Sequence, residues 1–167
     1  DDFIDVGNLI SGGETQATIS AWVYKTGGGF GKILGQGDGS GNTGLYLGYG
    51  LFNTTDIALY VATESDSSPI KYIYSGSGTA PLNQWNHVAV TRNSGTGRIF
   101  LNGVLQDTQA DATDYNQAGG RGFVIGYRPY FETNTYFNGF LSEIRITTGL
   151  ARYTADFNVP TTVFPEE

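Results

Sequence analysis

The chain has 167 residues, no cysteine, 16 acidic and 9 basic side chains, 25 glycines and 14% aromatic residues. One domain of this length buries about 70% of its unfolded surface, so residues 1–167 are predicted to form a single domain without disulfides. The net charge of −7, with scattered basic residues, argues against a nucleic-acid partner. It also predicts that anionic polysaccharides are repelled at long range unless a bound cation intervenes. No apolar run approaches the roughly 18 residues of a membrane span, so membrane insertion is not expected.

The chain contains no methionine and begins with no recognisable signal peptide. We therefore expect a domain that belongs to a longer protein, with neighbouring domains of that protein as partners. The absence of cysteine is compatible with any compartment.

Apolar residues alternate with period two between clusters of Gly, Asn, Ser and Asp, which predicts short strands and tight turns. Residues 17–24 form one such strand, in which the odd-numbered residues are apolar and share one face while Trp22 lies on the other. Further strands are predicted at residues 31–37, 44–49, 57–63, 70–74, 85–92, 98–101, 104–107, 123–127 and 137–147. So many short strands at regular spacing predict an all-β sandwich or barrel.

Two local patterns are more specific. Asn102-Gly103 lies between RIFL and VLQD, and because this dipeptide accepts positive φ angles, it predicts a two-residue β-hairpin. Residues 149–157 are the only segment in which a short helical turn is expected. The tail that follows contains Pro160 and Pro165 and is predicted to lie extended against the body of the domain.

Three stretches, residues 18–24, 85–103 and 136–165, resemble in order and spacing the laminin-G-like domains of the concanavalin A-like lectin/glucanase superfamily. The branch in question occurs in phage tail proteins and large bacterial surface proteins. The resemblance covers nearly the whole chain and implies a jelly-roll sandwich of two antiparallel sheets, one flat and one curved. It also implies that Trp85, which opens a strand of the shared motif, lies in the core.

The chain departs from this family pattern in two places. Relatives usually begin with a strand and a Phe-Asp-Gly-like turn before the equivalent of DDFIDVGN, so that first strand is absent here or lies upstream. Relatives also tend to carry Asp where this chain has Ser142, before the run from Glu143 to Ile146. If that Asp makes structural hydrogen bonds in the relatives, other groups must make those bonds in this chain.

The sequence does not support catalysis. Hydrolases of the superfamily place acids in a Glu-x-Asp-x-x-Glu or similar run on one strand face, whereas Glu64-Ser65-Asp66 is followed by no third acid. Lyases on related jelly rolls need a Tyr and a His beside an Arg, and Tyr136 faintly resembles their motif tyrosine. The single histidine, His87, lies in a motif that non-catalytic relatives share, so we expect a structural imidazole bonded to a neighbouring strand.

Calcium is the one cofactor for which the sequence offers candidate ligands. Proteins bind this ion through Asp side chains combined with backbone carbonyls, often in loops at the rim of a domain. The candidate ligands are Asp38, in the loop of residues 38–42, and Asp111 and Asp114, in the loop of residues 111–116. Asp and Asn in Gly-rich loops also form turns, and that interpretation is the more ordinary one.

A neutral glycan needs an aromatic platform ringed by hydrogen-bonding side chains. The loop after the predicted strand of residues 123–127 has this composition. Its candidate residues are Tyr127, Arg128, Tyr130, Phe131, Glu132, Asn134 and Tyr136. The other interpretation, that these rings close the end of the sandwich, stays open. Trp22 is a further candidate if it is exposed on its sheet rather than packed under a missing N-terminal strand.

We therefore predict a non-catalytic recognition module that binds surface glycan as part of a secreted, cell-surface or virion adhesin. One alternative is a structural or assembly module that contacts protein partners in a phage tail or surface protein. Its mark would be an oligomer or a lost partner strand near Asp1. The last alternative is an unusual glycan-cleaving enzyme.

Overall fold

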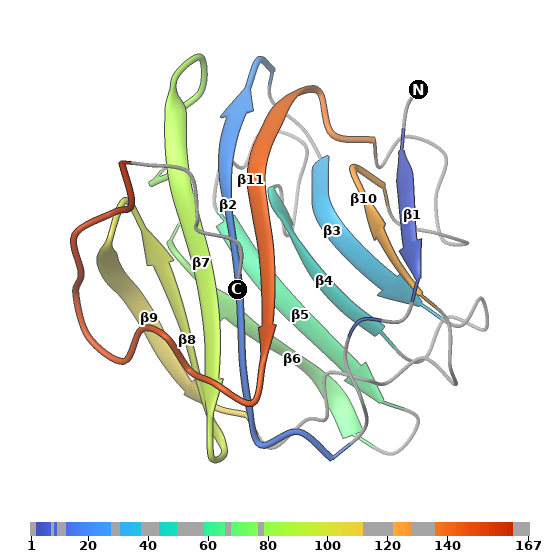
Figure 1. The fold of residues 1–167 in the computed structure, drawn as a ribbon, viewed down its shortest axis with the longest axis vertical. Coiled ribbons are helices and arrows are strands. Elements are labelled where there is room, and N and C mark those ends of the chain that lie inside the picture. The colour runs from blue at the N-terminus through green and yellow to red at the C-terminus, as the bar shows by residue number, and fades with distance from the viewer. Residues whose placement is uncertain are drawn as a thin grey trace.

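The computed structural model describes residues 3–7, 9, 13–27, 31–37, 44–49, 59–65, 68–76, 79–111, 122–127 and 136–161. The regular structure in these ranges is entirely β, and no helix capable of crossing a membrane occurs in them. The strands, labelled in Figure 1, are β1 (Ile4–Gly7), β2 (Gln16–Lys25), β3 (Gly31–Gly37), β4 (Gly44–Tyr49), β5 (Leu59–Ser65), β6 (Ser68–Tyr74), β7 (Trp85–Asn93), β8 (Thr96–Leu101), β9 (Val104–Ala110), β10 (Phe123–Ile125) and β11 (Gly139–Thr148).

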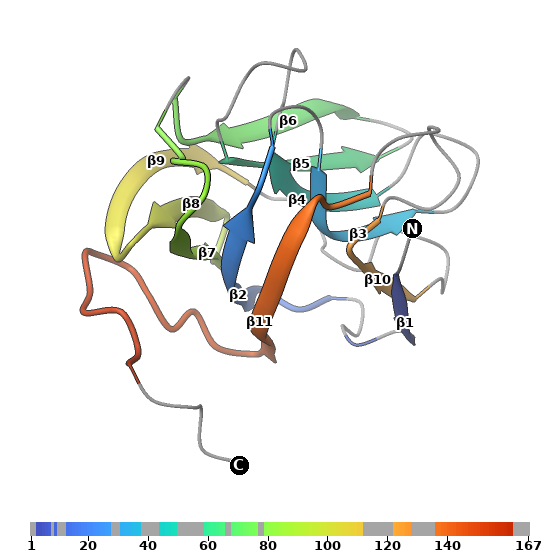
Figure 2. The same ribbon diagram turned by 90° about the horizontal axis from the view of Figure 1, so that it is seen from above.

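The strands form two antiparallel sheets that face each other. The six-stranded sheet has the order β1-β10-β3-β4-β5-β6, and the five-stranded sheet has the order β11-β2-β7-β8-β9. Figure 2 shows the two sheets as separate layers. The predicted all-β sandwich is therefore confirmed, and the predicted strands match the observed ones to within a few residues. The connection between the strands expected at residues 57–63 and 70–74 is shorter than predicted, because Ser65 and Ser68 already pair.

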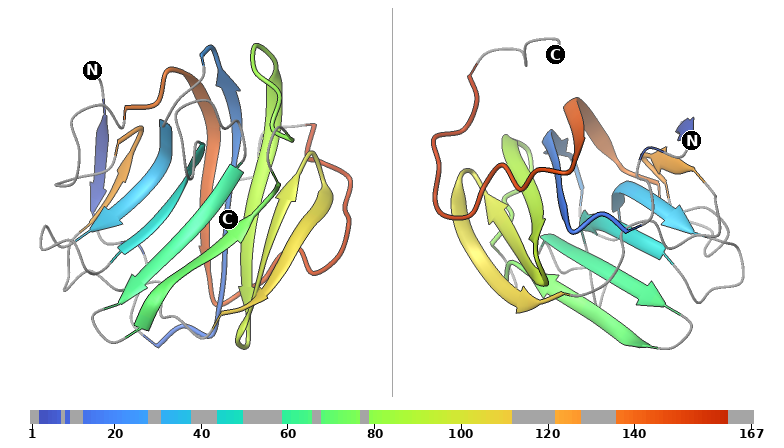
Figure 3. Two further views of the ribbon diagram at one scale, coloured as in Figure 1. Left: turned by 180° about the vertical axis from the view of Figure 1, so that it is seen from behind. Right: turned by 60° about the horizontal axis from the view of Figure 1, so that its bottom comes forward.

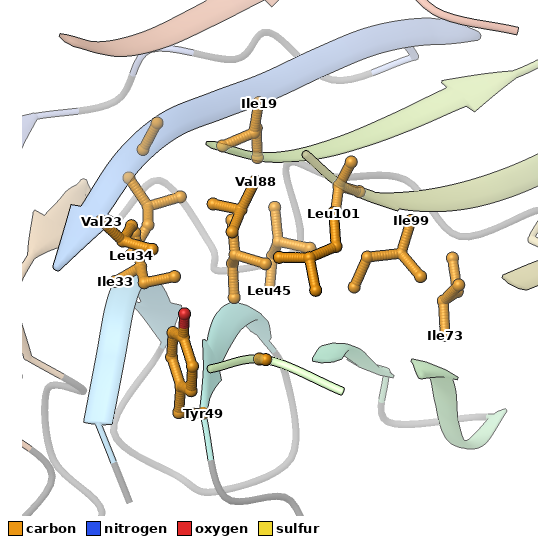
Figure 4. Packing of buried hydrophobic residues seen from close by; sticks show 14 of the residues in the cluster. Ile19, Val23, Ile33, Leu34, Leu45, Tyr49, Ile73, Val88, Ile99 and Leu101 are labelled. Carbon is orange, nitrogen blue, oxygen red and sulfur yellow. The ribbon is translucent and has the colours of Figure 1, made fainter. Parts of the chain in front are cut away.

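Alternating apolar side chains from both sheets build the core between the layers (Figure 4). The odd-numbered residues of β2 from Ala17 to Val23 are at most 1% exposed, as their period-two pattern predicts. They meet Val88, Val90, Ile99, Leu101, Ile33, Leu34, Leu45, Leu47 and Ile73. Each large aliphatic side chain buried in this way contributes about 1.5–3 kcal/mol, which explains why the register of each strand is specified.

The hairpin between β8 and β9 has the predicted geometry. Asn102 has φ 51° and Gly103 has φ 80°, the two positive angles of a type I′ turn. The Asn102 side chain also holds the neighbouring strand: its Oδ1 accepts the His87 N–H at 2.8 Å, and its Nδ2 donates to Asn86 Oδ1 at 3.0 Å. This asparagine therefore fixes both the turn and the position of β7.

Residues 149–161 contain no helix, so the predicted helical turn is wrong. The segment instead crosses the outer face of the five-stranded sheet, away from the other layer (Figures 2 and 3). Strand side chains satisfy its backbone: Thr18 Oγ1 donates to the Leu150 carbonyl at 2.9 Å, and Thr91 Oγ1 donates to the Tyr153 carbonyl at 2.8 Å. Because these partners come from distant strands, the segment lies extended. Of the predicted extended tail, Pro160 is half-buried, and Pro165 lies outside the described residues.

The two sheet edges nearest the termini also bear on the sequence predictions. The DDFIDVGN segment itself supplies an edge strand, since β1 pairs with β10 through Ile4 and Ile125. At the edge of the other sheet, the register of β11 shifts between Ser142 and Arg145, and Glu143 has φ 51°. Strand β11 therefore bends through a bulge at the position where the family pattern changes.

Candidate functional site

His87 is enclosed in the protein and cannot serve as an exposed base. Its side chain is fully buried, and the rings of Trp22, Tyr153 and Phe157 surround it at centroid distances of 5.4, 6.5 and 5.7 Å. Burial lowers the pKa of the imidazole from 6.5 to about 4, because no solvent stabilises the charged form. Neither ring nitrogen has a hydrogen-bond partner, so the expected imidazole bond to a neighbouring strand is wrong. The structural role of the residue is aromatic packing.

Trp22 lies on the outer face of the five-stranded sheet and is half-buried. Its register partner on β7 is His87, which it contacts edge-on. The N-terminal strand β1 belongs to the other sheet and does not cover it. Trp22 therefore acts partly as a wall of the His87 enclosure.

The structure brings Tyr127 and Tyr136 together at the end of the sandwich. Their rings stack with centroids 4.5 Å apart and an interplanar angle of 22°, and Phe3 contacts Tyr127 at 5.8 Å. Two backbone bonds fix this geometry: Gly126 N–H donates to the Ile33 carbonyl at 3.0 Å, and Phe137 N–H donates to the Gly126 carbonyl at 2.8 Å. The remaining candidates of this loop, Arg128, Tyr130, Phe131, Glu132 and Asn134, lie outside the described residues.

Neighbouring Phe137, rather than the tyrosine pair, packs against the core at this end of the domain. Its ring contacts buried Tyr49 with centroids 6.2 Å apart, whereas both tyrosines are half-buried and stack on each other. Phe137 therefore packs against the core at this place, while the tyrosine pair stays half-buried among the described residues.

Next to Phe137 lies a buried lysine, Lys25, that the sequence analysis did not single out. Lys25 Nζ has no hydrogen-bond partner and lies 5.8 Å from the Tyr49 ring centroid and 5.7 Å from that of Phe137. Burial lowers the pKa of Lys25 and raises that of Tyr49, whose hydroxyl points between the sheets (Figure 4) and is also unpartnered. The alternation from Ala17 to Val23 places residue 25 on the same inward face, and that parity is the signal that could have identified it.

Replacing Lys25 with methionine is expected to stabilise the domain by about 1–3 kcal/mol, because the change removes a buried amine without a hydrogen-bond partner and keeps the length of the side chain. The gain should be larger at pH 7 than near pH 10.5, where the unfolded chain also loses the lysine proton. Urea unfolding at both pH values measures it. Lys32→Met is the matched control, since Lys32 is buried but has an interaction partner. A destabilised Lys25→Met variant would contradict this interpretation of the amine.

Of the three predicted calcium ligands, only Asp111 is described. It follows β9 and is buried, its N–H donates to the Gly95 carbonyl at 2.8 Å, and its carbonyl accepts Arg92 Nε–H at 3.3 Å. No group of three or more His, Asp or Glu side chains suited to a metal occurs in the ranges that the structure describes. Asp38 and Asp114 lie outside these ranges, so the described residues supply no ligand set for calcium.

Trp85 is not in the core, so that prediction is wrong. Its side chain is 46% exposed, because odd-numbered residues of β7 face outward and the inward positions are taken by Asn86, Val88 and Val90. In the register of the five-stranded sheet, Phe140 pairs with Tyr24 and Tyr24 pairs with Trp85. We call these three residues, which sequence analysis missed as a set, the aromatic row. Strand parity alone would have placed Trp85 outward.

Comparisons with known proteins agree with this architecture. A family model described as the concanavalin A-like lectin/glucanases superfamily matches residues 1–151. No curated protein matches the chain. Among solved structures, it is similar to the carbohydrate-binding module CBM40 of the Ruminococcus gnavus IT-sialidase, with a TM-score of 0.68 and 15% identity over 92% of this chain and 93% of that one.

Two further structures are less completely covered. Domain 4 of the extracellular arabinanase AbnA from Geobacillus stearothermophilus has a TM-score of 0.62 and 19% identity over 86% of this chain and 64% of its own. Mouse laminin α1 domains LG4-5 have a TM-score of 0.67 and 11% identity over 99% of this chain and 45% of their own. At these identities the likeness concerns the fold. Since the family model spans most of the sequence, the chain belongs to the concanavalin A-like lectin/glucanases superfamily.

Proposed function

We propose that this domain is a non-catalytic carbohydrate-binding module. The observation that carries the proposal is the stacked Tyr127–Tyr136 pair, in which Tyr127 lies two residues after β10 and Tyr136 three residues before β11. Aromatic rings with a free face pack against the C–H faces of sugars, and rings held by each other lose little entropy on binding. The polar loop between the two tyrosines supplies hydrogen-bonding side chains in sequence, among them Asn134.

Similar structures support a sugar as the ligand. The sialidase module has been solved with α2,3-sialyllactose and the arabinanase domain with arabinotriose. Both are parts of larger glycan-degrading enzymes, which is compatible with a module of a secreted or surface protein. We extend the proposal to an extracellular setting, on a cell-surface or virion adhesin, as the family resemblance implies.

The environment of His87 supports the absence of catalysis. A general base must reach the proton that it abstracts, and this imidazole is fully buried behind Tyr153 and Phe157. Its pKa of about 4 keeps it neutral, but no substrate atom can approach it. The role of the only histidine in the chain is therefore explained by its packing against aromatic rings.

Substituting Tyr127 or Tyr136 with alanine is expected to weaken glycan binding by roughly tenfold each, because each change removes one ring of the pair. A glycan array identifies ligands of the unmodified domain, with calcium and with a chelator, and calorimetry then compares the variants. Leu150→Ala is the control, since Leu150 is 46% exposed and belongs to the segment on the outer sheet face. Unchanged affinity in both tyrosine variants would show that the pair is not the binding site. If the unmodified domain binds no glycan on the array, the proposed function is wrong.

A second candidate function, assembly with protein partners, is favoured by the edge strand β1. Phe3, just before this strand, and Ile4, its first residue, are 53% and 60% exposed. An edge strand with exposed apolar side chains can pair with another chain. Sedimentation at several concentrations tests it, because an assembly module would form oligomers that Ile4→Lys disrupts.

A further inference from the structure

The aromatic row, Phe140, Tyr24 and Trp85, lies on the outer face of the five-stranded sheet and is separate from the Tyr127–Tyr136 pair. Its members come from the adjacent strands β11, β2 and β7. The Tyr24 ring contacts Trp85 at a centroid distance of 5.7 Å and Phe140 at 5.9 Å, with interplanar angles of 67° and 63°. The three rings therefore form one continuous line across the strands.

The C-terminal segment of residues 149–161, which crosses the outer face of this sheet, does not cover the aromatic row. Tyr153 and Phe157 of that segment pack on His87, two residues after Trp85 in β7, and on Phe100 in the neighbouring strand β8. Beyond their reach, Phe140 is 63% exposed and Trp85 is 46% exposed. Single exposed apolar residues are ordinary, but aligned aromatic neighbours on three strands mark a binding surface.

The exposed chain neighbours of the row, all of them among the described residues, are uncharged. Every exposed residue within two chain positions of the three rings carries a hydroxyl or amide group. These residues are Thr26, Asn83, Gln84, Asn138 and Ser142. Rings bordered by neutral donors and acceptors suit sugar hydroxyls, and the chain's net charge of −7 disfavours acidic polysaccharides.

The size of the row excludes a stable protein interface as its main purpose. A buried aromatic side chain covers about 150–250 Å², so the exposed parts of three rings offer on the order of 300 Å². A stable protein complex buries roughly 800 Å² on each partner. We propose that the aromatic row binds a neutral oligosaccharide chain laid across β11, β2 and β7, as a second contact surface that does not require the tyrosine pair to bind sugar.

The two tryptophans of the chain provide a direct probe. The Trp22→Phe variant leaves Trp85 as the only fluorophore of this type. When this variant is titrated with a soluble neutral β-glucan, galactomannan or arabinan, we expect the Trp85 emission to shift to the blue and its quenching by acrylamide to fall. The acidic polysaccharide polygalacturonate should cause neither change. Unchanged Trp85 emission with all three neutral polysaccharides overturns the inference.

Affinities of alanine variants test the contribution of each ring. Trp85→Ala and Phe140→Ala are each expected to weaken binding of the responding polysaccharide by roughly tenfold. Val104→Ala should not, because Val104 is 52% exposed on the same sheet but outside the row. If only the Tyr127 and Tyr136 variants lose binding, the glycan-binding function stands and the row is overturned. The row is also overturned if its variants abolish a dimer seen by sedimentation, which would make it a contact between copies.

Discussion

Acidification from pH 7 to pH 4 is expected to cost the domain about 3 kcal/mol of stability through His87 alone. The pKa of His87 lies at about 4 in the folded protein and at 6.5 in the unfolded chain. Between these values the unfolded chain binds a proton that the folded protein does not, so stability falls as the pH drops from 6.5 to 4 and levels off below. Each pKa unit corresponds to about 1.4 kcal/mol, and because the folded imidazole is itself half protonated at pH 4, the cost reached at that pH is about 3 kcal/mol.

Urea unfolding at pH 7, 5.5 and 4 measures this loss, with His87→Leu as the control. The variant keeps an apolar side chain under Tyr153 and Phe157, so it should lose only the stability that the carboxylates contribute on acidification. The difference between the two proteins isolates the imidazole. Parallel pH profiles, or an NMR titration of His87 with its midpoint near 6.5, would falsify the role assigned to burial.

Replacing Phe157 with alanine is expected to destabilise the domain by about 2–3 kcal/mol. The Phe157 ring stacks on Tyr153 at 3.6 Å and 9°, and it contacts Phe100 at 5.4 Å and His87 at 5.7 Å. Because the ring is half-buried, the cost should lie below that of a fully buried phenylalanine. The change also admits water to the imidazole, so the pKa of His87 should rise toward 6.5.

Thr154→Ala is the control for this experiment, since Thr154 is exposed in the same segment and its change should alter stability by less than about 0.5 kcal/mol. Chemical denaturation gives the stability difference, and an NMR titration gives the pKa. A Phe157→Ala protein with a stability close to that of the unmodified domain would show that the segment does not seal the sheet. An unmoved His87 pKa would show that other groups exclude water from it.

Strand alternation and the Asn-Gly turn could be interpreted correctly because both are local. In β2, side chains two residues apart share a face, so the apolar residues Ala17 to Val23 identify the inward side without knowledge of the partner sheet. The same rule places Lys25 inward and Trp85 outward. The family motif suggested the opposite for Trp85, and the parity of β7 decided the outcome.

The helical turn expected at residues 149–157 failed for a different reason. The backbone of this segment is satisfied by Thr18 and Thr91, side chains 62 or more positions away in the chain. No pattern within the segment encodes those partners. The same holds for the stacking of Tyr127 on Tyr136, which depends on backbone bonds from Gly126 to Ile33 and from Phe137 to Gly126.

Local chemistry along the chain was thus sufficient to predict an all-β domain of short strands, the inward face of β2 and the turn at Asn102-Gly103, and the family resemblance supplied the two antiparallel sheets. Packing between distant segments decided which outward-facing rings are sealed and which reach solvent. His87 and Phe100 lie under the C-terminal segment, whereas Trp85 and Phe140 lie beyond it. The physical reason is that period two determines only the side of a sheet, while exposure on that side depends on hydrogen bonds and ring contacts made across the whole length of the chain.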